Sequence, residues 1–589
     1  MSEKKVEEFN LAEKSFEITP AKQPMQATLA LNAVLLLCAI TFVLCILLSV
    51  APLSRLPDPV IQLQTPFGVQ LAQVGAWLPN NLGLIANHQD SQASTDYVEF
   101  LVLITLAFVI YVLCILFVLR QTPQGVNNKQ YHQTLRLIWL ATITAGLIYV
   151  FTPAMLSHDI FVYASYSRMM TTYHSNPYFA PLSAFPHDPL YHLNVWANAT
   201  AAYGPVWLVI CSLWGFILGP QPLAYVLSFR LFALVLHLLN TWLVTIILRA
   251  NRQTSREVIL GTLLYAWNPL VLLESSLGGH NDVFMVTFIL LGILLSIHAE
   301  MKNQLTHPRG YLPPMIAFTM ATLIKFTTLP LIALFIIFLA LRTLRPMQST
   351  AFSLRKALLH RWRPALLTVC IACITGVSLA LVLYGPFWIG HSLNSIQDSF
   401  TSPPSARFAQ NSILLAIFKW NKANFLPSNA GSWSLGYTLI QVLSSRQTWD
   451  IINTIILAGL IIMGAIWLWH TLTLRIFILS ALATLGILLI VTPWFFSWYI
   501  TWLVGLAAIC LPLANKRIGL AFIAFTLTFS ASAFLTYPFK EGYAPFGIWM
   551  GPVCLMTIGP PLLVFLILYV AWRPVKKLSP DVNKMEAGS

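Results

Sequence analysis

The chain has 589 residues, of which 57% are hydrophobic and only 9% carry charge, and its formal net charge is +14. Typical soluble domains contain about 25% charged residues, so a string of soluble domains, a secreted enzyme, a nuclear factor and a disordered scaffold are excluded. Apolar stretches of about 18 residues or more recur from Leu29 to Leu566, and such stretches cross a bilayer as helices. The composition predicts an all-α polytopic membrane protein that is partnered by the lipid bilayer and not by nucleic acid.

About fourteen membrane spans are predicted along the chain. In order, they cover approximately 27–51, 98–119, 137–154, 222–248, 258–273, 282–299, 312–324, 329–341, 364–384, 448–469, 476–493, 496–513, 518–535 and 546–571. The first apolar run is long, follows about 26 polar residues and lacks a small-residue cleavage pattern, so we interpret it as a span and not as a signal peptide. Lys and Arg gather in alternate connecting segments that include both tails, and the positive-inside bias then places both termini in the cytoplasm.

Two segments do not fit simple spans. Residues 204–218 are apolar, but about 15 residues rise only about 22 Å against a hydrocarbon core of about 30 Å. A crossing there would also move the basic segment 249–257 to the outside, so we predict a helix at the outer interface that ends near Gly219. Residues 312–341 are too many for one span and too few for two. We predict a hairpin of two short helices with Lys325 at its turn.

A first cluster of polar side chains is predicted on the outer side, in segment 155–221. Asp159 follows an apolar run directly, at the junction between membrane and water. Partial desolvation is expected to raise the pKa of Asp159 and to make it a proton acceptor. The alternative is that Asp159 caps the helix that begins at Ile160. Further polar side chains of this segment are His158, Tyr163, Asn176, Tyr178 and Tyr203.

A second polar cluster lies between the fifth and sixth predicted spans. Glu274 is followed by His280, Asn281 and Asp282, which lead directly into the next helix. Two carboxylates, an imidazole and an amide at the outer rim could bind hydroxyl groups. The alternative is that Asn281 or Asp282 caps that helix.

Two cations are predicted within or between spans. Arg230 lies about 10 Å inside the outer end of its span, and Lys325 lies in the hairpin turn. Because burying a charge is costly, intramembrane ionisable residues indicate function, and both could contact an anionic headgroup. Arg230 could equally be snorkelling or paired with a carboxylate. Trp498 and Tyr499, near the outer end of their span, fit either sugar stacking or an interfacial aromatic belt.

The sequence lacks the usual nucleotide and metal motifs. No G-x-G-x-x-G follows a strand and no P-loop is present, so no nucleotide site and no cofactor are predicted. The histidines show no H-E-x-x-H or regular ligand spacing, so no metal site is predicted. Cys370 and Cys373 lie in mid-span without a second pair and are interpreted as packing residues. An enzyme acting at the outer face would therefore take an activated group from a lipid carrier.

The order of these polar residues resembles that of the polyprenol-phosphate-mannose-dependent α-mannosyltransferases of bacterial envelopes, which are multi-span glycosyltransferases of the GT-C type. The motifs that carry the resemblance are His158-Asp159, Tyr163, Asn176-Pro177-Tyr178, Tyr203-Gly204-Pro205, Arg230, His280-Asn281-Asp282, Lys325, Tyr384-Gly385-Pro386 and Trp498-Tyr499. The resemblance implies a GT-C-like bundle with outer-face juxtamembrane helices and a polyprenyl-monophosphate sugar donor. It also implies that Asp159, in the first large outer loop, is the catalytic residue.

These observations predict how the chain is divided. The expected parts are a cytoplasmic tail 1–26, two added spans in 27–119 with outer loop 52–97, a catalytic core 120–513 with outer loops 155–221 and 385–447, C-terminal spans in 514–571, and a cytoplasmic tail 572–589.

The expected activity is inverting transfer of a sugar, mannose by the resemblance, to a glycan or glycolipid acceptor at the outer face of the cell membrane. Asp159 would be the general base. Lys325 would stabilise the departing phosphate, with Arg230 or Arg407 as second candidate. The side chains expected to bind donor and acceptor are His158, Tyr163, Asn176, Tyr178, Tyr203, His280, Asn281, Asp282, Trp498 and Tyr499.

Two alternatives remain open. A transporter or lipid flippase would also have many spans, broken helices and buried cations, but its ionisable groups are expected near the bilayer midplane between related halves. Here they favour the outer rim, and no convincing internal repeat is found. A ligase or polymerase of lipid-linked glycans would keep the fold and change the donor. More outer-facing cations would be expected for it than Arg168, which is alone in segment 155–221.

Overall fold

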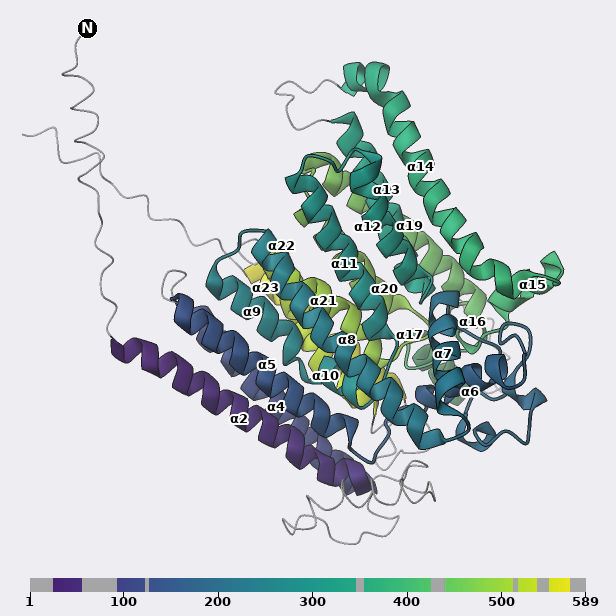
Figure 1. Cartoon of the computed structure of the whole chain (residues 1–589), viewed down its shortest axis with the longest axis horizontal. Helices are drawn as coiled ribbons and strands as arrows, with labels where there is room; N and C mark the ends of the chain where they lie inside the picture. The colour runs from purple at the N-terminus through teal and green to yellow at the C-terminus, as the bar shows by residue number, and fades with distance from the viewer. Residues whose placement is uncertain are drawn as a thin grey trace, which may run out of the picture.

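The computed structural model describes residues 25–55, 93–121, 127–345, 354–424, 439, 441–511, 517–537 and 550–571. The described residues form a bundle of helices without a named β-strand (Figure 1). In chain order the elements are α2 (Met25–Arg55), α4 (Ala93–Arg120), α5 (Asn128–Val150), α6 (Asp159–Thr171), η2 (Leu182–Ala184), η3 (Tyr191–Leu193), α7 (Pro205–Leu218), α8 (Pro222–Ala250), α9 (Ser255–Ala266), α10 (Pro269–Ser276), α11 (Asp282–Met301), α12 (Pro308–Thr322), η4 (Phe326–Thr328), α13 (Leu329–Leu344), α14 (Leu354–Trp388), α15 (Leu393–Thr401), α16 (Pro404–Arg407), α17 (Ile413–Asn424), α19 (Arg446–His470), α20 (Leu474–Val491), η6 (Ser497–Ile500), α21 (Thr501–Ile509), α22 (Arg517–Ser532), η8 (Ala533–Thr536) and α23 (Met550–Ala571).

The described part of the chain holds 11 helices that are long and apolar enough to cross a membrane, or 12 if α9 and α10, which are bent by 49°, form one span. The polytopic all-α prediction is confirmed, but the predicted number of fourteen is not. Two of the predicted spans, 312–324 and 496–513, correspond to short helices, because α12 has 15 residues and the apolar helix Ser497–Ile509 is also short. Helices of that length rise only about 20–23 Å.

Several short helices gather at one end of the bundle, where α6, α7, α15 and α16 lie close together (Figure 1). The predicted short helix in 204–218 is confirmed as α7, which starts at Pro205 and is followed by Gly219 with φ of 61°. The predicted turn at Lys325 is also confirmed, since Lys325 lies between α12 and α13, but of the two helices predicted to be short only α12 is so, because residues 326–344 are long and apolar enough to cross a membrane. The interruptions between these helices therefore place polar residues at this end of the bundle.

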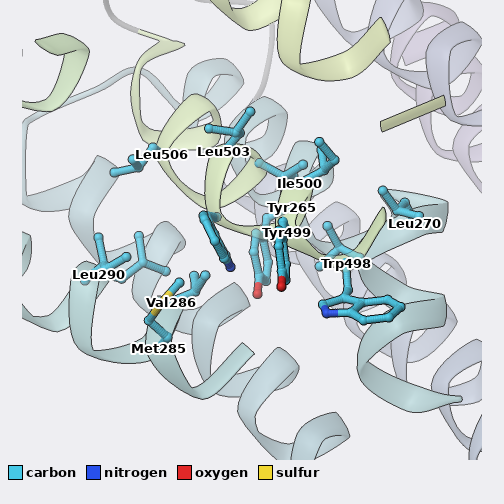
Figure 2. Packing of buried hydrophobic residues seen from close by; sticks show 14 of the residues in the cluster. Tyr265, Leu270, Met285, Val286, Leu290, Trp498, Tyr499, Ile500, Leu503 and Leu506 are labelled. Atoms are coloured by element: carbon cyan, nitrogen blue, oxygen red, sulfur yellow. The ribbon is translucent and has the colours of Figure 1, made fainter. Parts of the chain in front are cut away.

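The centre of the bundle is apolar and aromatic. Helix α11 packs against α8, α12 and α21. Figure 2 shows Leu503 and Leu506 of α21 near Met285, Val286 and Leu290 of α11, and all five side chains are buried. Close packing of this kind fixes the rotation of both helices. It thereby fixes the polar residues at their ends.

The helices α2 and α4 pack against each other, and α2 also packs against α5. The ring of Phe42 in α2 stacks on Trp267, at the bend between α9 and α10, with centroids 5.2 Å apart and planes at 7°. The hydroxyl of Tyr111 in α4 donates to the Leu264 carbonyl at 2.7 Å. The two N-terminal helices thus contact the bend that leads into α10.

Candidate active site

The carboxylate of Asp159 points into the molecule. Asp159 is the first residue of α6, whose N-cap is His158. Its Oδ2 accepts a hydrogen bond from Tyr203 at 3.0 Å and a longer one from Tyr163 at 3.4 Å, and its side chain is 15% exposed. The capping alternative for Asp159 is therefore wrong, because its side chain is directed at these hydroxyls.

The expected direction of the Asp159 pKa shift is also wrong. Burial does raise the pKa of this carboxyl, as the sequence suggested. The hydrogen bond and charge of His280, the hydrogen bond from Tyr203 and the charge of Lys325 outweigh burial and lower its pKa below the ordinary value. The effect of neighbouring charges and hydrogen bonds on the Asp159 pKa is thus larger than the effect of desolvation, and Asp159 is held as a carboxylate.

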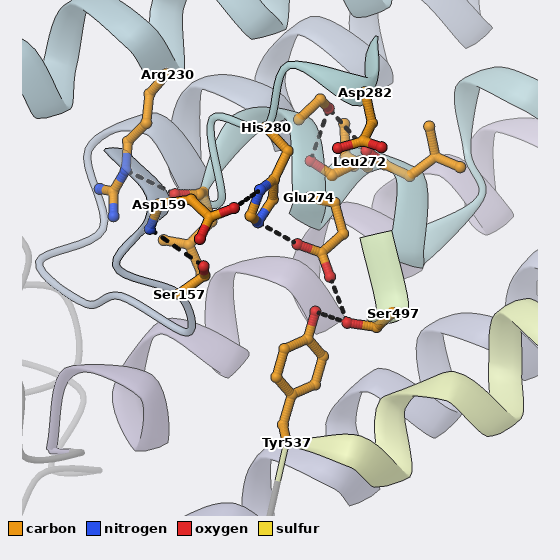
Figure 3. A network of polar contacts seen from close by, with 12 residues as sticks. Ser157, Asp159, Arg230, Leu272, Glu274, His280, Asp282, Ser497 and Tyr537 are labelled. Carbon is orange, nitrogen blue, oxygen red and sulfur yellow. Dashed lines mark hydrogen bonds and ion pairs between the residues drawn. The ribbon is translucent and has the colours of Figure 1, made fainter. Parts of the chain in front are cut away.

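The imidazole of His280 lies between two carboxylates (Figure 3). Its Nδ1 is 3.6 Å from Asp159 Oδ2, and its Nε2 is 3.2 Å from Glu274 Oε2. Its ring stacks on Trp498, with centroids 4.0 Å apart and planes at 14°. Burial lowers the pKa of His280, but the two carboxylates outweigh this effect and raise it to about 9. The ring is therefore an imidazolium at neutral pH.

A left-handed glycine places this histidine. Gly279 has φ of 61°, a conformation that only glycine adopts without strain. A Cβ at this position would also lie 2.9 Å from the Ile160 side chain, in the first turn of α6. The turn that carries His280 consequently packs directly on the turn that carries Asp159.

The ammonium of Lys325 forms the second charged group of the site. Lys325 Nζ donates to Asp282 Oδ1 at 2.8 Å, and Trp502 Nε1 donates to the same oxygen at 2.6 Å. The ammonium also lies 3.9 Å from the centre of the Tyr499 ring, within the range of a cation–π interaction. Burial outweighs the opposing charges of Asp282 and Asp159 and lowers the pKa of Lys325 below its ordinary value.

A backbone contact joins the segment that carries Tyr203, a partner of Asp159, to the segment that carries Lys325. The amide of Gly204 donates to the Ile324 carbonyl at 3.0 Å, and the amide of Val206 donates to the Leu323 carbonyl at 3.1 Å. A Cβ on Gly204 would overlap the Leu323 carbonyl oxygen, so only glycine permits this approach. Tyr203, which contacts Asp159, is thereby fixed beside Lys325.

Two adjoining cavities open around these groups. The larger, of about 350 Å³, is lined by Lys325, Arg446 and Trp502 together with leucines of α20. The smaller, of about 50 Å³, is lined by Asp159 and Trp498. The walls that both cavities share are formed by Ala202, Tyr203, Ser405, Trp494 and Tyr499. Asp159 and Lys325 therefore lie on either side of one aromatic partition.

A third cavity, of about 100 Å³, adjoins the larger one and is mostly aromatic. Tyr178, Phe326, Tyr384 and Phe400 line it. The hydroxyl of Tyr178 donates to the Tyr203 carbonyl at 2.9 Å. This cavity therefore meets the partition at Tyr203.

Asn176 has a structural position. Its amide nitrogen donates to the Phe387 carbonyl at 2.6 Å, and its Oδ1 accepts from the Tyr178 amide at 3.1 Å. It thereby ties the loop after α6 to the end of α14.

Trp498 and Tyr499 do not form an aromatic belt. Both are buried, and their rings contact His280 and Lys325 respectively. The interpretation as interfacial anchors is wrong for these two residues. Both residues line the Asp159 cavity, but the ring of Trp498 already stacks on His280 and on Phe496, which leaves it no open face for sugar stacking.

Arg230 is bound by backbone carbonyls. Its guanidinium donates to Leu277 at 2.8 Å, to Val150 at 3.2 Å, to Thr152 at 2.7 Å and also to Ala154. Its side chain is fully buried. The snorkelling interpretation of Arg230 is wrong, because the guanidinium is buried and bound by backbone carbonyls, and its assignment as the second cation for a leaving phosphate has no support from this geometry.

Arg446, and not Arg407, lines the larger cavity. The Arg407 side chain is exposed and donates to the Thr401 carbonyl at 3.2 Å. Arg446 pairs with Asp450 at 2.9 Å and donates to the carbonyls of Ser405 and Phe408. Arg446 was not predicted, because nothing in its local sequence places it near Lys325.

The remaining predicted residues lie nearby. His158 and Asn281 are the N-cap residues of α6 and α11, and neither caps its helix through its side chain. The capping alternative for Asn281 and Asp282 is thus not supported. Asn281 is buried between His280 and Asp282. Among the described residues, no group of three or more His, Cys, Asp or Glu side chains is arranged to hold a metal ion.

Glu274 was not assigned a role of its own from the sequence. Its Oε1 accepts a hydrogen bond from Ser497 Oγ at 2.9 Å, and Ser497 Oγ lies 2.7 Å from the Tyr537 hydroxyl oxygen (Figure 3). A buried carboxylate near a membrane span is itself a signal of function. Its partners are far away in the chain and could not be predicted.

Comparison with known proteins gives a match over just under half of the chain. Residues 67–342 match the family described as Alpha-(1->6)-mannopyranosyltransferase, N-terminal domain. The match supports a mannosyltransferase family of the GT-C type and, over these residues, the predicted resemblance to α-mannosyltransferases. No curated protein and no solved structure gives a match.

The mannosyltransferase match includes the charged side chains Asp159, Glu274, His280 and Lys325. The aromatic wall at Trp498 and Tyr499 lies C-terminal to it. Both parts of the chain thus contribute to one site within a multi-pass membrane protein.

Proposed function

We propose that the protein transfers a mannosyl group from a polyprenyl-monophosphate donor to a hydroxyl of a glycan or glycolipid acceptor, with inversion, at the outer face of the membrane. The mannosyltransferase match supports the sugar. The observation that carries the mechanism is the placement of a carboxylate and an ammonium in adjoining cavities with common walls at Tyr203 and Tyr499.

Asp159 is the general base in this proposal. The hydrogen bonds described for its side chain and its contact with His280 all go to Oδ2, which leaves Oδ1 for the acceptor hydroxyl. Oδ1 takes the hydroxyl proton while the acceptor oxygen forms a bond to the anomeric carbon. A carboxylate that stays ionised at neutral pH is in the correct protonation state for this step.

Lys325 stabilises the leaving group. The bond between the anomeric carbon and the phosphate oxygen breaks, and its electron pair leaves with the polyprenyl phosphate. A phosphate needs no proton to depart, and a nearby ammonium offsets its developing charge. The cavity beside Lys325 has apolar walls at Leu485, Leu488 and Leu489, which suits the first part of a prenyl chain.

The inverting step and the outer-face location rest on further arguments. A single displacement inverts the anomeric centre, so a β-linked donor gives an α-linked product. The basic segments of the chain lie in alternate connections that exclude the 155–221 and 385–447 loops. The positive-inside bias then favours the outer side for the cavities.

The test is transfer from polyprenyl phosphate that carries radiolabelled mannose, using the full chain in nanodiscs. We expect Asp159→Asn to lower kcat by about 100- to 10,000-fold while polyprenyl-phosphate binding stays within about twofold of the wild-type value. Asp398→Asn is the matched control, because Asp398 is an exposed carboxylate in α15 at the same end of the bundle. Full activity of Asp159→Asn would exclude Asp159 as the base, and movement of intact labelled donor without a new glycosidic bond would indicate a transporter.

A further inference from the structure

We propose that Glu274 is a positioning residue of this site, which is held by Ser497 and Tyr537 and keeps the His280 ring charged and turned toward Asp159. The proposal rests on the proposed function, because it assigns a role within the same reaction. It starts from a continuous line of polar side chains that runs from Asp159 through His280, Glu274 and Ser497 to Tyr537 (Figure 3).

The direction of the hydrogen bonds in this line follows from proton counting. The Ser497 hydroxyl has one proton, and an ionised carboxylate can only accept. Ser497 therefore donates to Glu274 at 2.9 Å, and the Tyr537 hydroxyl donates to Ser497 at 2.7 Å. Glu274, Ser497 and Tyr537 are all buried. The two hydroxyls thus hold the remote carboxylate at a fixed position.

The ring of His280 has little freedom to rotate. It stacks on Trp498, with planes at 14°, and Gly279 fixes its backbone in a left-handed turn. Its two nitrogens lie next to opposite carboxylates, Nδ1 at 3.6 Å from Asp159 and Nε2 at 3.2 Å from Glu274, as ion-pair contacts without hydrogen-bond geometry. The protonation of the two ring nitrogens therefore determines whether an N–H or a lone pair faces the Asp159 carboxylate.

A neutral His280 would act against Asp159. A neutral imidazole has one N–H, and the closer carboxylate, Glu274 at 3.2 Å compared with Asp159 at 3.6 Å, would hold that proton on Nε2. The lone pair on Nδ1 would then face the Asp159 carboxylate and repel it. With both nitrogens protonated, Nδ1 attracts Asp159 Oδ2 and keeps Oδ1 available to the acceptor. Activity therefore requires the charged ring, and Glu274 supplies half of the charge that maintains it.

The groups that face His280 come from several elements. Asp159, Tyr163 and Tyr203 lie on the side of the base, while Glu274, Ser497 and Tyr537 lie on the other. The charges of Lys325 and Asp282 are nearby and offset each other at 2.8 Å. Within the part of the chain that the structure describes, Glu274 and Asp159 are thus the carboxylates within 4 Å of the ring, and removal of Glu274 removes one of these two.

The experiment compares kcat as a function of pH for the wild type and Glu274→Gln. The amide keeps the size of the side chain and can still accept from Ser497. With one carboxylate fewer, His280 loses its proton at lower pH, so the alkaline limb of kcat should move down by about one unit or more. We expect about a twofold loss of kcat at pH 8 that grows toward tenfold above pH 9, nearly wild-type kcat at pH 6, and a nearly unchanged donor KM.

Two milder variants and one control accompany it. Ser497→Ala and Tyr537→Phe remove single hydroxyls and should move the alkaline limb in the same direction by a smaller amount. Glu300→Gln is the matched control, because Glu300 is a partly buried carboxylate that pairs with Arg342 at the other end of α11. A uniform loss at every pH, or an unchanged alkaline limb in Glu274→Gln and both milder variants, would overturn the proposal.

A second readout separates this proposal from the proposed function. The protonation of His280 can be followed by ¹⁵N-histidine NMR of the protein in nanodiscs, with His280→Asn used to assign the signal. We expect the titration midpoint to fall in Glu274→Gln whether or not mannose is transferred. An inactive wild type with a shifted midpoint would refute the transfer reaction alone, and an active wild type with an unshifted midpoint would refute the role of Glu274 alone.

Discussion

The ammonium nitrogen of Lys325 lies 3.9 Å from the centre of the Tyr499 ring. Because the same ammonium donates to Asp282 at 2.8 Å, the cation is held against the cavity wall from two directions. The Lys325 side chain cannot rotate freely, so a phosphate that enters the cavity would contact an ammonium group that is already in position. Preorganised charge of this kind is the main source of electrostatic stabilisation in enzymes.

We expect Lys325→Met to lower kcat by about 100- to 1,000-fold. The single variant also leaves Asp282 buried without its cation, which costs about 3–5 kcal/mol of stability. The double variant Lys325→Met, Asp282→Asn removes both charges, and its amide oxygen can still accept from Trp502. The double variant should melt close to the wild-type temperature while remaining inactive in the transfer assay. Recovery of activity in the double variant would contradict the role of Lys325.

The pH dependence on the acid side follows from Asp159. The base must be ionised, and because its pKa in the folded protein is lowered, the active form is present above that pKa and is lost as the pH falls through it. Activity should therefore persist on acidification to near the ordinary carboxylate pKa of about 3.9 or below.

Replacement of the imidazolium tests the cause of this lowered pKa. In His280→Gln, burial is no longer opposed by the ring, so the Asp159 pKa should rise and the acid limb of kcat should move to higher pH. Rate–pH profiles in nanodiscs measure the shift. Coincident acid limbs in the two proteins would show that His280 does not set the ionisation of Asp159.

Gly204 and Gly385 form a matched pair of test positions. A Cβ on Gly204 overlaps the Leu323 carbonyl oxygen, whereas a Cβ on Gly385 meets nothing within 4 Å. We expect Gly204→Ala to lose about 1–3 kcal/mol of stability and to reduce kcat, since it moves Tyr203 away from Asp159. Gly385→Ala should leave both properties close to those of the wild type. Thermal melting and the transfer assay check the pair, and equal effects at the two positions would refute the steric argument.

Arg230 should behave as a structural residue. Lysine keeps the charge but cannot reproduce the forked geometry of the guanidinium, so Arg230→Lys leaves carbonyls among residues 150–154 without a donor. Each unsatisfied buried group costs about 1–3 kcal/mol, and a lower melting temperature is expected. The donor KM of the folded fraction should stay unchanged. A raised donor KM with normal melting would instead assign Arg230 to phosphate binding.

Hydropathy alone predicted most of this fold because the spans are long and apolar. It counted α12 and the helix Ser497–Ile509 as spans, although both are shorter than the 18 residues of the shortest candidate span. Apolar composition reports burial, and such residues can be buried by protein as well as by lipid. The prediction of a span over 258–273 did not include the bend between α9 and α10, although Pro269 and Asn268, the N-cap residue of α10, mark it in the sequence.

The candidate site was predicted unevenly. Asp159, His280 and Lys325 were found because polar residues next to apolar runs are conspicuous. The direction of the Asp159 pKa shift was missed, since it depends on His280 at 3.6 Å, a residue of another helix connection. The role of Arg230 was missed for the same reason, because the carbonyls that bind it become available only where α5 ends in three dimensions.

The bend between α9 and α10 changes how the first two helices can be regarded. A bend interrupts the regular ladder of backbone hydrogen bonds, and the carbonyls of Leu264 and Ala266 accept hydrogen bonds from Tyr111 of α4 and from His237 of α8. In hydrocarbon no water could substitute for these donors. A shorter protein that began at α5 would have to straighten this segment or recruit another hydroxyl, and a straightened segment would carry Glu274 away from the imidazole it faces.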